Sequence, residues 1–159
     1  MALRMVLNEQ DPILRKRSRE VTDFNPRLWQ LLDDMAETMY QEDGAGLAAV
    51  QVGVLRRAVV VDVGEGLIEL VNPRIVDTRG AVEDSEGCLS SPGEYGLVVR
   101  PQWVKVQAQD RNGNAFEIEG EDLLARAFCH EIDHLEGVLF KDRMTHLLTR
   151  EELRRRRRR

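Results

Sequence analysis

The chain contains three histidines, and two of them, His130 and His134, lie four positions apart with Glu131 directly after the first. Residues four apart on an α-helix differ by about 40° in direction and about 6 Å in rise, so both imidazoles can reach one ion. Glu131 would lie beside that ion, where its carboxylate can accept a proton from an activated water. The pattern predicts a catalytic metal centre rather than two unrelated surface histidines.

Two histidines do not complete a catalytic metal site, which takes a third protein ligand and leaves one position open. The candidates are Cys88, His146 and the acidic residues. Cys88 follows a glycine, which permits a close backbone approach, and a bound ion deprotonates a thiol. His146 could be a ligand by its spacing, although a histidine satisfied by its neighbours is the more usual case. The residues alone leave this choice open.

A C-terminal helix over residues 122–136 is expected to carry the histidine pattern, and Gly137 follows it where a left-handed cap is needed. Its inward face is predicted to consist of Leu123, Ala127, His130, Glu131 and His134. That face changes from apolar to ionisable halfway along the helix. A purely structural helix has little reason to do so.

Strand patterns occupy the middle of the chain. Residues 58–63 are almost wholly apolar and β-branched, as expected of a buried strand, and residues 67–71 are expected to pair with it or lie nearby. The clearest hairpin has alternating segments at 103–108 and 115–118, joined across the Asn-Gly turn at 112–113.

An earlier amphipathic helix is expected over residues 25–41, because Asn25 and Pro26 are typical of an N-cap and a first helical position. The predicted fold class is therefore α+β, with small antiparallel β-sheets surrounding the C-terminal catalytic helix and the N-terminal helix packed outside. We expect residues 1–148 to form a single catalytic metallohydrolase domain and residues 149–159 a basic, disordered tail.

The amino-acid composition limits the kinds of binding partner and the cellular location to be expected. The chain is 42% hydrophobic and 32% charged, as in an ordinary globular protein, and no apolar run approaches the roughly 18 residues that span a bilayer. A cytoplasmic protein without a membrane partner is expected, and two cysteines are too few for a disulfide framework.

Charge is distributed unevenly. Removing the six arginines at 154–159 from the net charge of −5 leaves −11 on the remainder, which argues against nucleic acid as the main substrate. The arginine run is interpreted as a solvated end, with docking on ribosomal RNA as the alternative.

Three segments, residues 44–51, 86–90 and 130–135, resemble the three signature motifs of the peptide deformylase family, in the same order. The likeness continues through the predicted hairpin between them. It implies an enzyme that hydrolyses the N-formyl group from the N-terminal formyl-methionine of nascent bacterial polypeptides and releases formate. It also implies one divalent metal ion, with Fe²⁺ as the native ion and Zn²⁺, Ni²⁺ or Co²⁺ in purified protein.

The resemblance also implies roles for individual residues. The resemblance implies that Cys88 is the third metal ligand, together with His130 and His134, and that water or hydroxide occupies the fourth position. Glu131 would accept the proton of this water and pass it to the leaving amine. The side-chain amide of Gln51 and the backbone N–H of Leu89 would donate hydrogen bonds to the oxyanion.

Substrate contacts follow from the same resemblance. An extended peptide would bond to the main chain at Ala45, Gly46 and Gly87, and the methionine side chain would enter an apolar pocket that includes Ala127. An ion pair between Glu86 and Arg100 is a further hypothesis, since it would steady the cysteine loop.

Two positions depart from the usual family pattern. Ala45 stands where a larger branched aliphatic residue is common, and Cys129 stands where glutamine is common. Ala45 could widen the pocket, and Cys129 would place a second thiol near the metal. Two other functions remain as alternatives, a general zinc peptidase and an inactive homologue that docks on the ribosome through the arginine tail.

Overall fold

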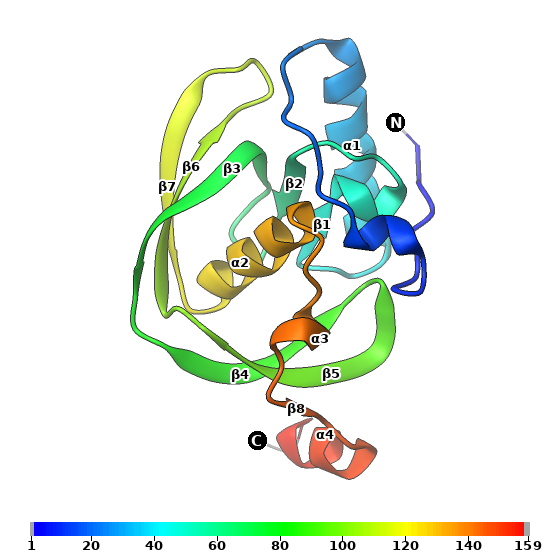
Figure 1. Cartoon of the computed structure of the whole chain (residues 1–159), viewed down its shortest axis with the longest axis vertical. Helices are drawn as coiled ribbons and strands as arrows, with labels where there is room; N and C mark the ends of the chain where they lie inside the picture. Colours follow the sequence, from blue (N-terminus) through cyan, green and yellow to red (C-terminus); the bar gives the residue numbers. More distant parts are fainter. Residues whose placement is uncertain (1, 158–159) are drawn as a thin grey trace.

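Two antiparallel sheets enclose the C-terminal helix α2 (Leu123–Leu135) (Figure 1). The protein's structure, a computed structural model, describes residues 2–157. Within these residues one sheet has the strand order β1-β2-β3-β6-β7 and the other the order β4-β5-β8. The strands are β1 (Gly46–Ala48), β2 (Ala58–Val61), β3 (Ile68–Arg79), β4 (Val82–Cys88), β5 (Ser91–Arg100), β6 (Trp103–Gln109), β7 (Ala115–Glu121) and β8 (His146–Leu147).

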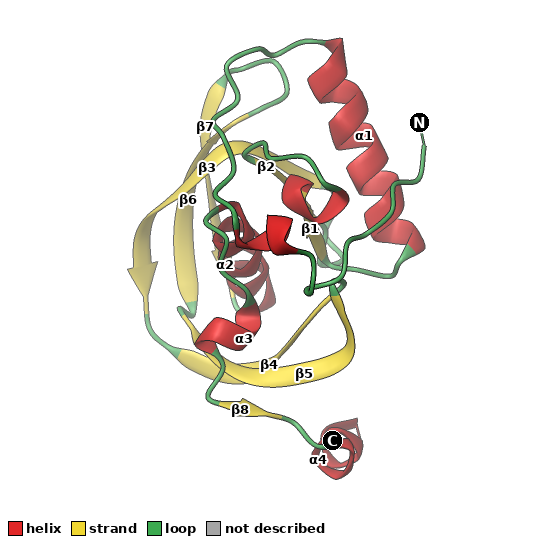
Figure 2. Cartoon of the chain, turned by 45° about the vertical axis from the view of Figure 1, so that its right-hand side comes forward, coloured by secondary structure: helices red, strands yellow, loops and turns green. Residues whose placement is uncertain are grey.

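The helices are α1 (Pro26–Gln41), α2 (Leu123–Leu135), α3 (Phe140–Arg143) and α4 (Arg150–Arg157), with short 3₁₀ turns η1 (Pro12–Arg15) and η2 (Ala49–Val52). Helix α2 lies between the two sheets, whereas α1 lies on the outside of the molecule (Figures 1 and 2). The predicted α+β class and arrangement are confirmed. No helix in the part of the chain that the structure describes is long and apolar enough to cross a membrane.

The predicted pairings within the five-stranded sheet are present. β2 pairs antiparallel with β3, and β6 pairs with β7 across the turn that contains Gly113, whose φ is +87°. The four residues of β2 are all buried, as their β-branched and apolar side chains require. The long β4–β5 hairpin had no clear pattern in the sequence, because β4 is mostly polar and only its first three residues are exposed.

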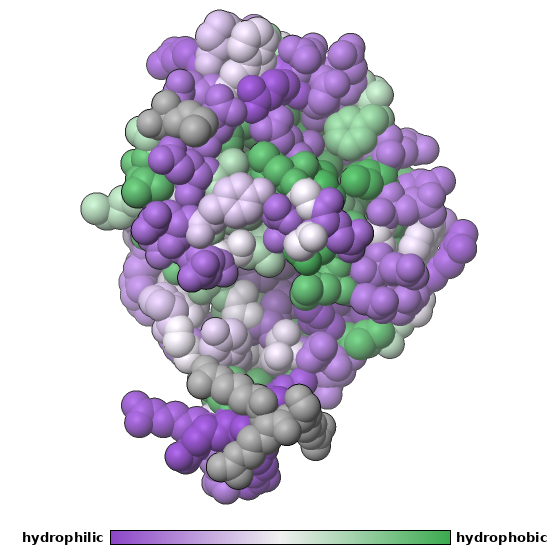
Figure 3. Space-filling view, turned by 180° about the vertical axis from the view of Figure 1, so that it is seen from behind, coloured by the Kyte–Doolittle hydropathy of each residue, from purple (hydrophilic) through white to green (hydrophobic). Residues whose placement is uncertain are grey.

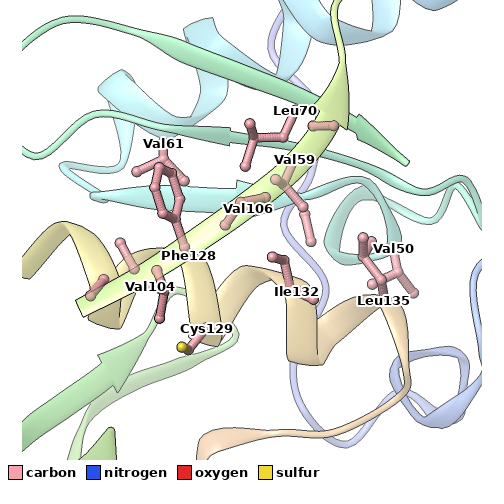
Figure 4. Packing of buried hydrophobic residues seen from close by; sticks show 14 of the residues in the cluster. Val50, Val59, Val61, Leu70, Val104, Val106, Phe128, Cys129, Ile132 and Leu135 are labelled. Atoms are coloured by element: carbon pink, nitrogen blue, oxygen red, sulfur yellow. The ribbon is translucent and has the colours of Figure 1, made fainter. Parts of the chain in front are cut away.

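The main core lies between α2 and the five-stranded sheet (Figure 4). Phe128, Ile132 and Leu135 of α2 pack in one cluster with buried residues of the sheet, including Val59 and Val106. This packing fixes the rotation of α2 about its axis. It therefore also fixes where the ionisable face of the helix points.

Helix α1 covers the opposite face of β1 and β2 through a second cluster. Asn25 caps it by accepting a hydrogen bond from the Leu28 amide at 3.1 Å, as its sequence predicted. At the end of α2, Gly137 has a φ of +75°, and a side chain there would collide with the carbonyl of Arg15.

Two expectations differ from the structure. Leu123, the first residue of α2, is 58% exposed rather than inward-facing. Residues 150–157 of the expected disordered tail form α4. Ion pairs of Arg155 with Glu151 and of Arg156 with Asp84 accompany this helix.

Candidate metal centre and active site

Cys88, His130 and His134 bring one ligand atom each into a group in which all the atoms lie within 4.8 Å of one another. The two histidine Nε2 atoms are 3.2 Å apart, and Cys88 Sγ is 3.4 Å from Nε2 of His134. A tetrahedral ion with usual bond lengths separates two nitrogen ligands by about 3.3 Å and a nitrogen from a sulfur by about 3.6 Å. The three residues therefore fit a divalent metal ion.

His146, the competing third ligand, lies elsewhere. It is in β8, is exposed, and its Nε2 lies 2.9 Å from the carboxylate of Glu152. This is the satisfied histidine that the sequence favoured. Cys88 instead ends β4 at a tight turn into β5, where it is paired with Ser91, and this turn carries the thiol to the histidines.

Glu86 holds His130 in place from behind the centre. Its Oε1 lies 2.6 Å from His130 Nδ1, and its two oxygens accept from Arg100 at 2.6 and 3.0 Å and from Arg126 at 2.9 Å. Burial alone would raise the pKa of Glu86, but the bonds from His130 and Arg100 lower it to about 2. An ionised Glu86 accepts a hydrogen bond from the Nδ1–H group of His130, and this leaves the Nε2 lone pair for a metal ion.

The ion pair hypothesised between Glu86 and Arg100 is present in the structure. It belongs to a larger network that the sequence did not indicate. Arg126 of α2 also donates to the carbonyls of Val98 and Val82, and Arg100 also donates to Asp133 at 2.7 Å. A polar residue inside an apolar helix segment was the one available signal for Arg126, because a buried arginine requires partners.

Glu131 is 4% exposed, and its Oε2 lies 3.9 Å from Nε2 of His130. Burial raises the pKa of Glu131 to about 7, although a charge on His130 acts in the opposite direction. Its Oε1 is buried without a hydrogen-bond partner among the described residues. Glu131 therefore has an unused acceptor atom beside the candidate metal ligands, which is the arrangement that a proton carrier requires.

Gly46 makes room for this carboxyl group. A Cβ at residue 46 would lie 2.5 Å from Oε2 of Glu131 and 2.8 Å from its Cγ. Gly87 similarly admits the ring of Tyr95, and Gly44 admits the side chain of Leu89. These small residues are explained by packing inside the site itself, independently of any contact with a peptide.

Gln51 is 1% exposed, which excludes the alternative of a solvent-facing residue. Its Oε1 accepts from the Ala48 amide at 2.9 Å, and this bond orients the side chain. Its Nε2 lies 3.1 Å from Ser90 Oγ and 3.4 Å from Cys88 Sγ. The amide donor is thereby aimed at the cysteine edge of the centre, where Leu89 also lies.

A pocket of about 520 Å³ is lined by Gln51, Cys88, His130 and Glu131. All four predicted substrate-contact residues line it, namely Ala45, Gly46, Gly87 and Ala127. It also reaches Arg126, Leu123 and Tyr95, and its outer part includes the acidic residues Glu42, Asp43 and Glu94. From behind, the surface is mostly hydrophilic, with hydrophobic residues in a broken band across its middle (Figure 3).

Cys129 does not join the metal ligands. It is buried in the core cluster around α2, and burial raises the pKa of its thiol to about 11 (Figure 4). The expected second thiol near the metal is therefore a neutral core side chain. Ala45 is exposed at the pocket, where its small size leaves the wall open.

A His-Glu-x-x-His helix with a cysteine partner, a buried carboxyl group and an adjoining pocket defines the class of metal-dependent hydrolases. Comparison with known proteins narrows this class. Residues 3–150 match the family model for polypeptide deformylase. The peptide deformylase of Caldanaerobacter subterraneus subsp. tengcongensis is 60% identical over 153 residues, which cover 96% of each chain.

Solved structures agree with this result. The crystal structure of peptide deformylase from Thermotoga maritima has a TM-score of 0.88 at 42% identity and covers 90% of this chain and 98% of its own. A structure from Legionella pneumophila has a TM-score of 0.86 at 45% identity, covering 98% and 92%. The chain belongs to the peptide deformylase family, whose members are metal-dependent hydrolases that remove the N-formyl group from nascent polypeptides.

Proposed function

We propose that this chain deformylates the N-terminal formyl-methionine of nascent polypeptides at the centre formed by Cys88, His130 and His134. The observation that carries the proposal is that the three ligand atoms lie within 4.8 Å of one another. Two of these residues, Cys88 and His130, line one pocket together with Glu131 and Gln51. Fe²⁺ is proposed as the native ion, with Zn²⁺, Ni²⁺ or Co²⁺ as substitutes. Imidazole and thiolate ligands together suit these ions better than Mg²⁺ or Ca²⁺.

The ion, when bound, supplies Lewis acidity for activating a water molecule and polarising the formyl carbonyl. Glu131 accepts the proton of the attacking water and later delivers it to the leaving amine. Gln51 Nε2 and the Leu89 N–H donate to the carbonyl oxygen as it gains charge, each worth about 3 kcal/mol. Formate and a free N-terminal methionine are the products.

The peptide itself binds as an added strand in this proposal. β1 and β4 are edge strands of the two sheets, and both contribute lining residues to the pocket. Main-chain groups at Ala45, Gly46 and Gly87 can therefore pair with an extended peptide. The methionine side chain enters the pocket beside Ala127, where Leu123 at the first turn of α2 adds apolar surface.

We further propose that residues 1–148 act as one catalytic domain and that the basic residues 149–159 dock on ribosomal RNA, which places the enzyme in the cytoplasm beside its substrates. The support is charge, because the chain without the six arginines at 154–159 carries a net charge of −11, so RNA is repelled over most of its surface. Deleting residues 154–159 should leave hydrolysis of a short formyl-peptide unchanged and weaken ribosome binding. Equal ribosome binding at matched salt would reject this role.

The activity is tested by measuring formate release from a formyl-methionyl peptide, with the acetyl-methionyl and unblocked peptides as controls. Deformylation predicts turnover of the formyl peptide alone. Cleavage of internal peptide bonds would instead support a general zinc peptidase. No turnover by metal-loaded protein would support an inactive homologue.

A further inference from the structure

The surface around the N-terminal segment gathers arginines that are far apart in the sequence. The Arg19 amide donates to the Leu55 carbonyl at 3.0 Å, and the Arg57 amide donates to the Arg19 carbonyl at 2.9 Å. The Val21 amide donates to Oδ1 of Asn72 at 2.8 Å. These bonds hold residues 17–21 beside the segment before β2 and the bend within β3. The arginines of this region, here called the arginine belt, are Arg17, Arg19, Arg27, Arg56, Arg57 and Arg74.

Two neighbouring cavities follow the arginine belt. The larger, of about 780 Å³, is lined by Arg17, Arg19, Arg57 and Arg74 among others, and the smaller, of about 330 Å³, by Arg27 and Arg56. A β-bridge between Arg19 and Arg56 joins the two groups. The positive charges therefore form one extended surface rather than isolated sites.

Four members of the arginine belt, Arg19, Arg27, Arg56 and Arg74, are exposed and have no carboxylate within 4.0 Å in the described residues. This is unexpected in a chain with 28 acidic and 23 basic residues, where carboxylates are in excess.

Arginines in other parts of the protein form ion pairs with carboxylates. Arg79, Arg100, Arg111, Arg126 and Arg143 all have an acidic partner. Near the belt, Glu136 pairs with Arg17 and Arg57, and the other acids that line the two cavities are Glu20 and Asp23. Two of the six belt arginines thus share one carboxylate, and the other four have no paired carboxylate among the described residues.

The arginine belt is separate from the catalytic pocket. Ile132 of α2 and Glu136, the residue that follows α2, line the larger cavity, whereas His130 and Glu131 line the catalytic pocket. Two positions along a helix correspond to a rotation of about 200°, so Ile132 and His130 lie on opposite faces of α2. A ligand on the belt would leave the mouth of the catalytic pocket open.

We propose that the arginine belt binds the phosphate backbone of RNA, as a surface distinct from the C-terminal segment. Guanidinium groups bind phosphate in bidentate fashion, and several of them spread over two cavities match a polyanion better than a single anion. A third cavity shares Arg74 and Asn72 and is also lined by Phe116 and by the acidic residues Glu20 and Glu117. Phe116 is partly buried against the core, so the positive charge of the belt rather than this ring carries the proposal.

The test uses the full chain and a labelled single-stranded RNA of mixed sequence, with binding followed by fluorescence anisotropy over a range of salt concentrations. The variant Arg19→Gln/Arg74→Gln removes two belt charges. The matched control Arg79→Gln/Lys105→Gln removes two charges from β3 and β6 at a distance from the belt. Both pairs are also made in a chain without residues 154–159, so that the C-terminal segment cannot mask the effect.

The belt variant should weaken RNA binding at least about tenfold at low salt and reduce the slope of log affinity against log salt by about 1.4, because each phosphate contact in a single strand contributes about 0.7. The control should change affinity less than about twofold. Thermal unfolding and formyl-peptide hydrolysis should match the parent in both variants, which separates this proposal from the proposed catalytic function. Arg27→Gln/Arg56→Gln provides an independent second variant.

Three results would overturn the proposal. The first is equal RNA affinity of the belt and control variants. The second is belt-dependent binding to vesicles that contain phosphatidylglycerol without belt-dependent binding to RNA, which would assign the surface to membranes. The third is inorganic phosphate displacing the RNA at equal ionic strength, which would indicate a site for one small anion.

Discussion

Nδ1 of His130 lies 2.6 Å from Oε1 of Glu86, a residue 44 positions earlier in the chain. This bond joins the catalytic helix to the second sheet and fixes which nitrogen of His130 faces the cysteine. Arg100 and Arg126 hold the same carboxylate from the other side. The orientation of a proposed metal ligand therefore depends on a buried ion network rather than on the helix alone.

Replacing Glu86 with Gln should weaken metal binding by about tenfold or more. The substitution removes a negative charge that orients His130 and that also balances the buried guanidinium groups of Arg100 and Arg126. Competition with a chelator of known affinity measures the effect. Glu83→Gln, at an exposed position in the same strand, is the control. Unchanged metal affinity in Glu86→Gln would show that the network serves only the fold.

Replacing Gly46 with Ala should reduce kcat by at least about tenfold without loss of metal. The new Cβ would lie 2.5 Å from Glu131 Oε2, and the carboxyl group must move to avoid it. Steady-state kinetics and metal analysis on the same sample separate a displaced proton carrier from a lost ion. Parent-like kcat would mean that the position of Glu131 is less critical than the geometry indicates.

The N-terminal segment contributes to stability through Asp34, which is buried on α1. Burial alone would raise the pKa of Asp34, but hydrogen bonds from the Ala2 amide, Gln30 and Arg4 lower it below its usual value. A carboxyl group with a lowered folded-state pKa stabilises the fold above its unfolded pKa, and this stability is lost as the pH falls through the folded pKa. Asp34→Asn should therefore cost about 1–3 kcal/mol at pH 7 and less at pH 3.

Urea unfolding at the two pH values measures this effect, and Asp23→Asn, at an exposed residue, is the control. An equal loss of stability at pH 7 and pH 3 would contradict the ionised role of Asp34.

The proposed Fe²⁺ form should lose activity in air faster than the Ni²⁺ or Co²⁺ forms. A ferrous ion and the Cys88 thiolate are two oxidisable partners at one site that opens to a pocket. Activity is followed over hours in air and under argon for each metal form. An iron form that is stable for days in air would count against iron as the native ion.

Local patterns predicted much of the fold. The spacing of apolar residues located α1 and α2, and the Asn-Gly turn located the β6–β7 hairpin, because in each case neighbouring residues determine the element. The polar strand β4 could not be predicted this way, since its pairing with β5 and its position beside α2 come from tertiary contacts.

The same limit applies to the site. The His-Glu-x-x-His spacing identified the helix, but residue chemistry alone could not choose between Cys88 and His146. The choice depends on the β4–β5 turn, which brings Cys88 to within 3.4 Å of His134. Arg126 was missed because its partners, Glu86 and two strand carbonyls, are 28 to 44 positions away in the sequence.

The central claim is that Glu131 transfers the proton while Cys88, His130 and His134 hold the ion. The most direct test is the turnover of a formyl-methionyl peptide by Glu131→Gln, with metal content determined on the same sample. Gln keeps the size of the side chain and removes the proton acceptor, so turnover should fall by at least about a hundredfold while one metal ion per chain is retained. Turnover near that of the parent, with the metal bound, would contradict the account.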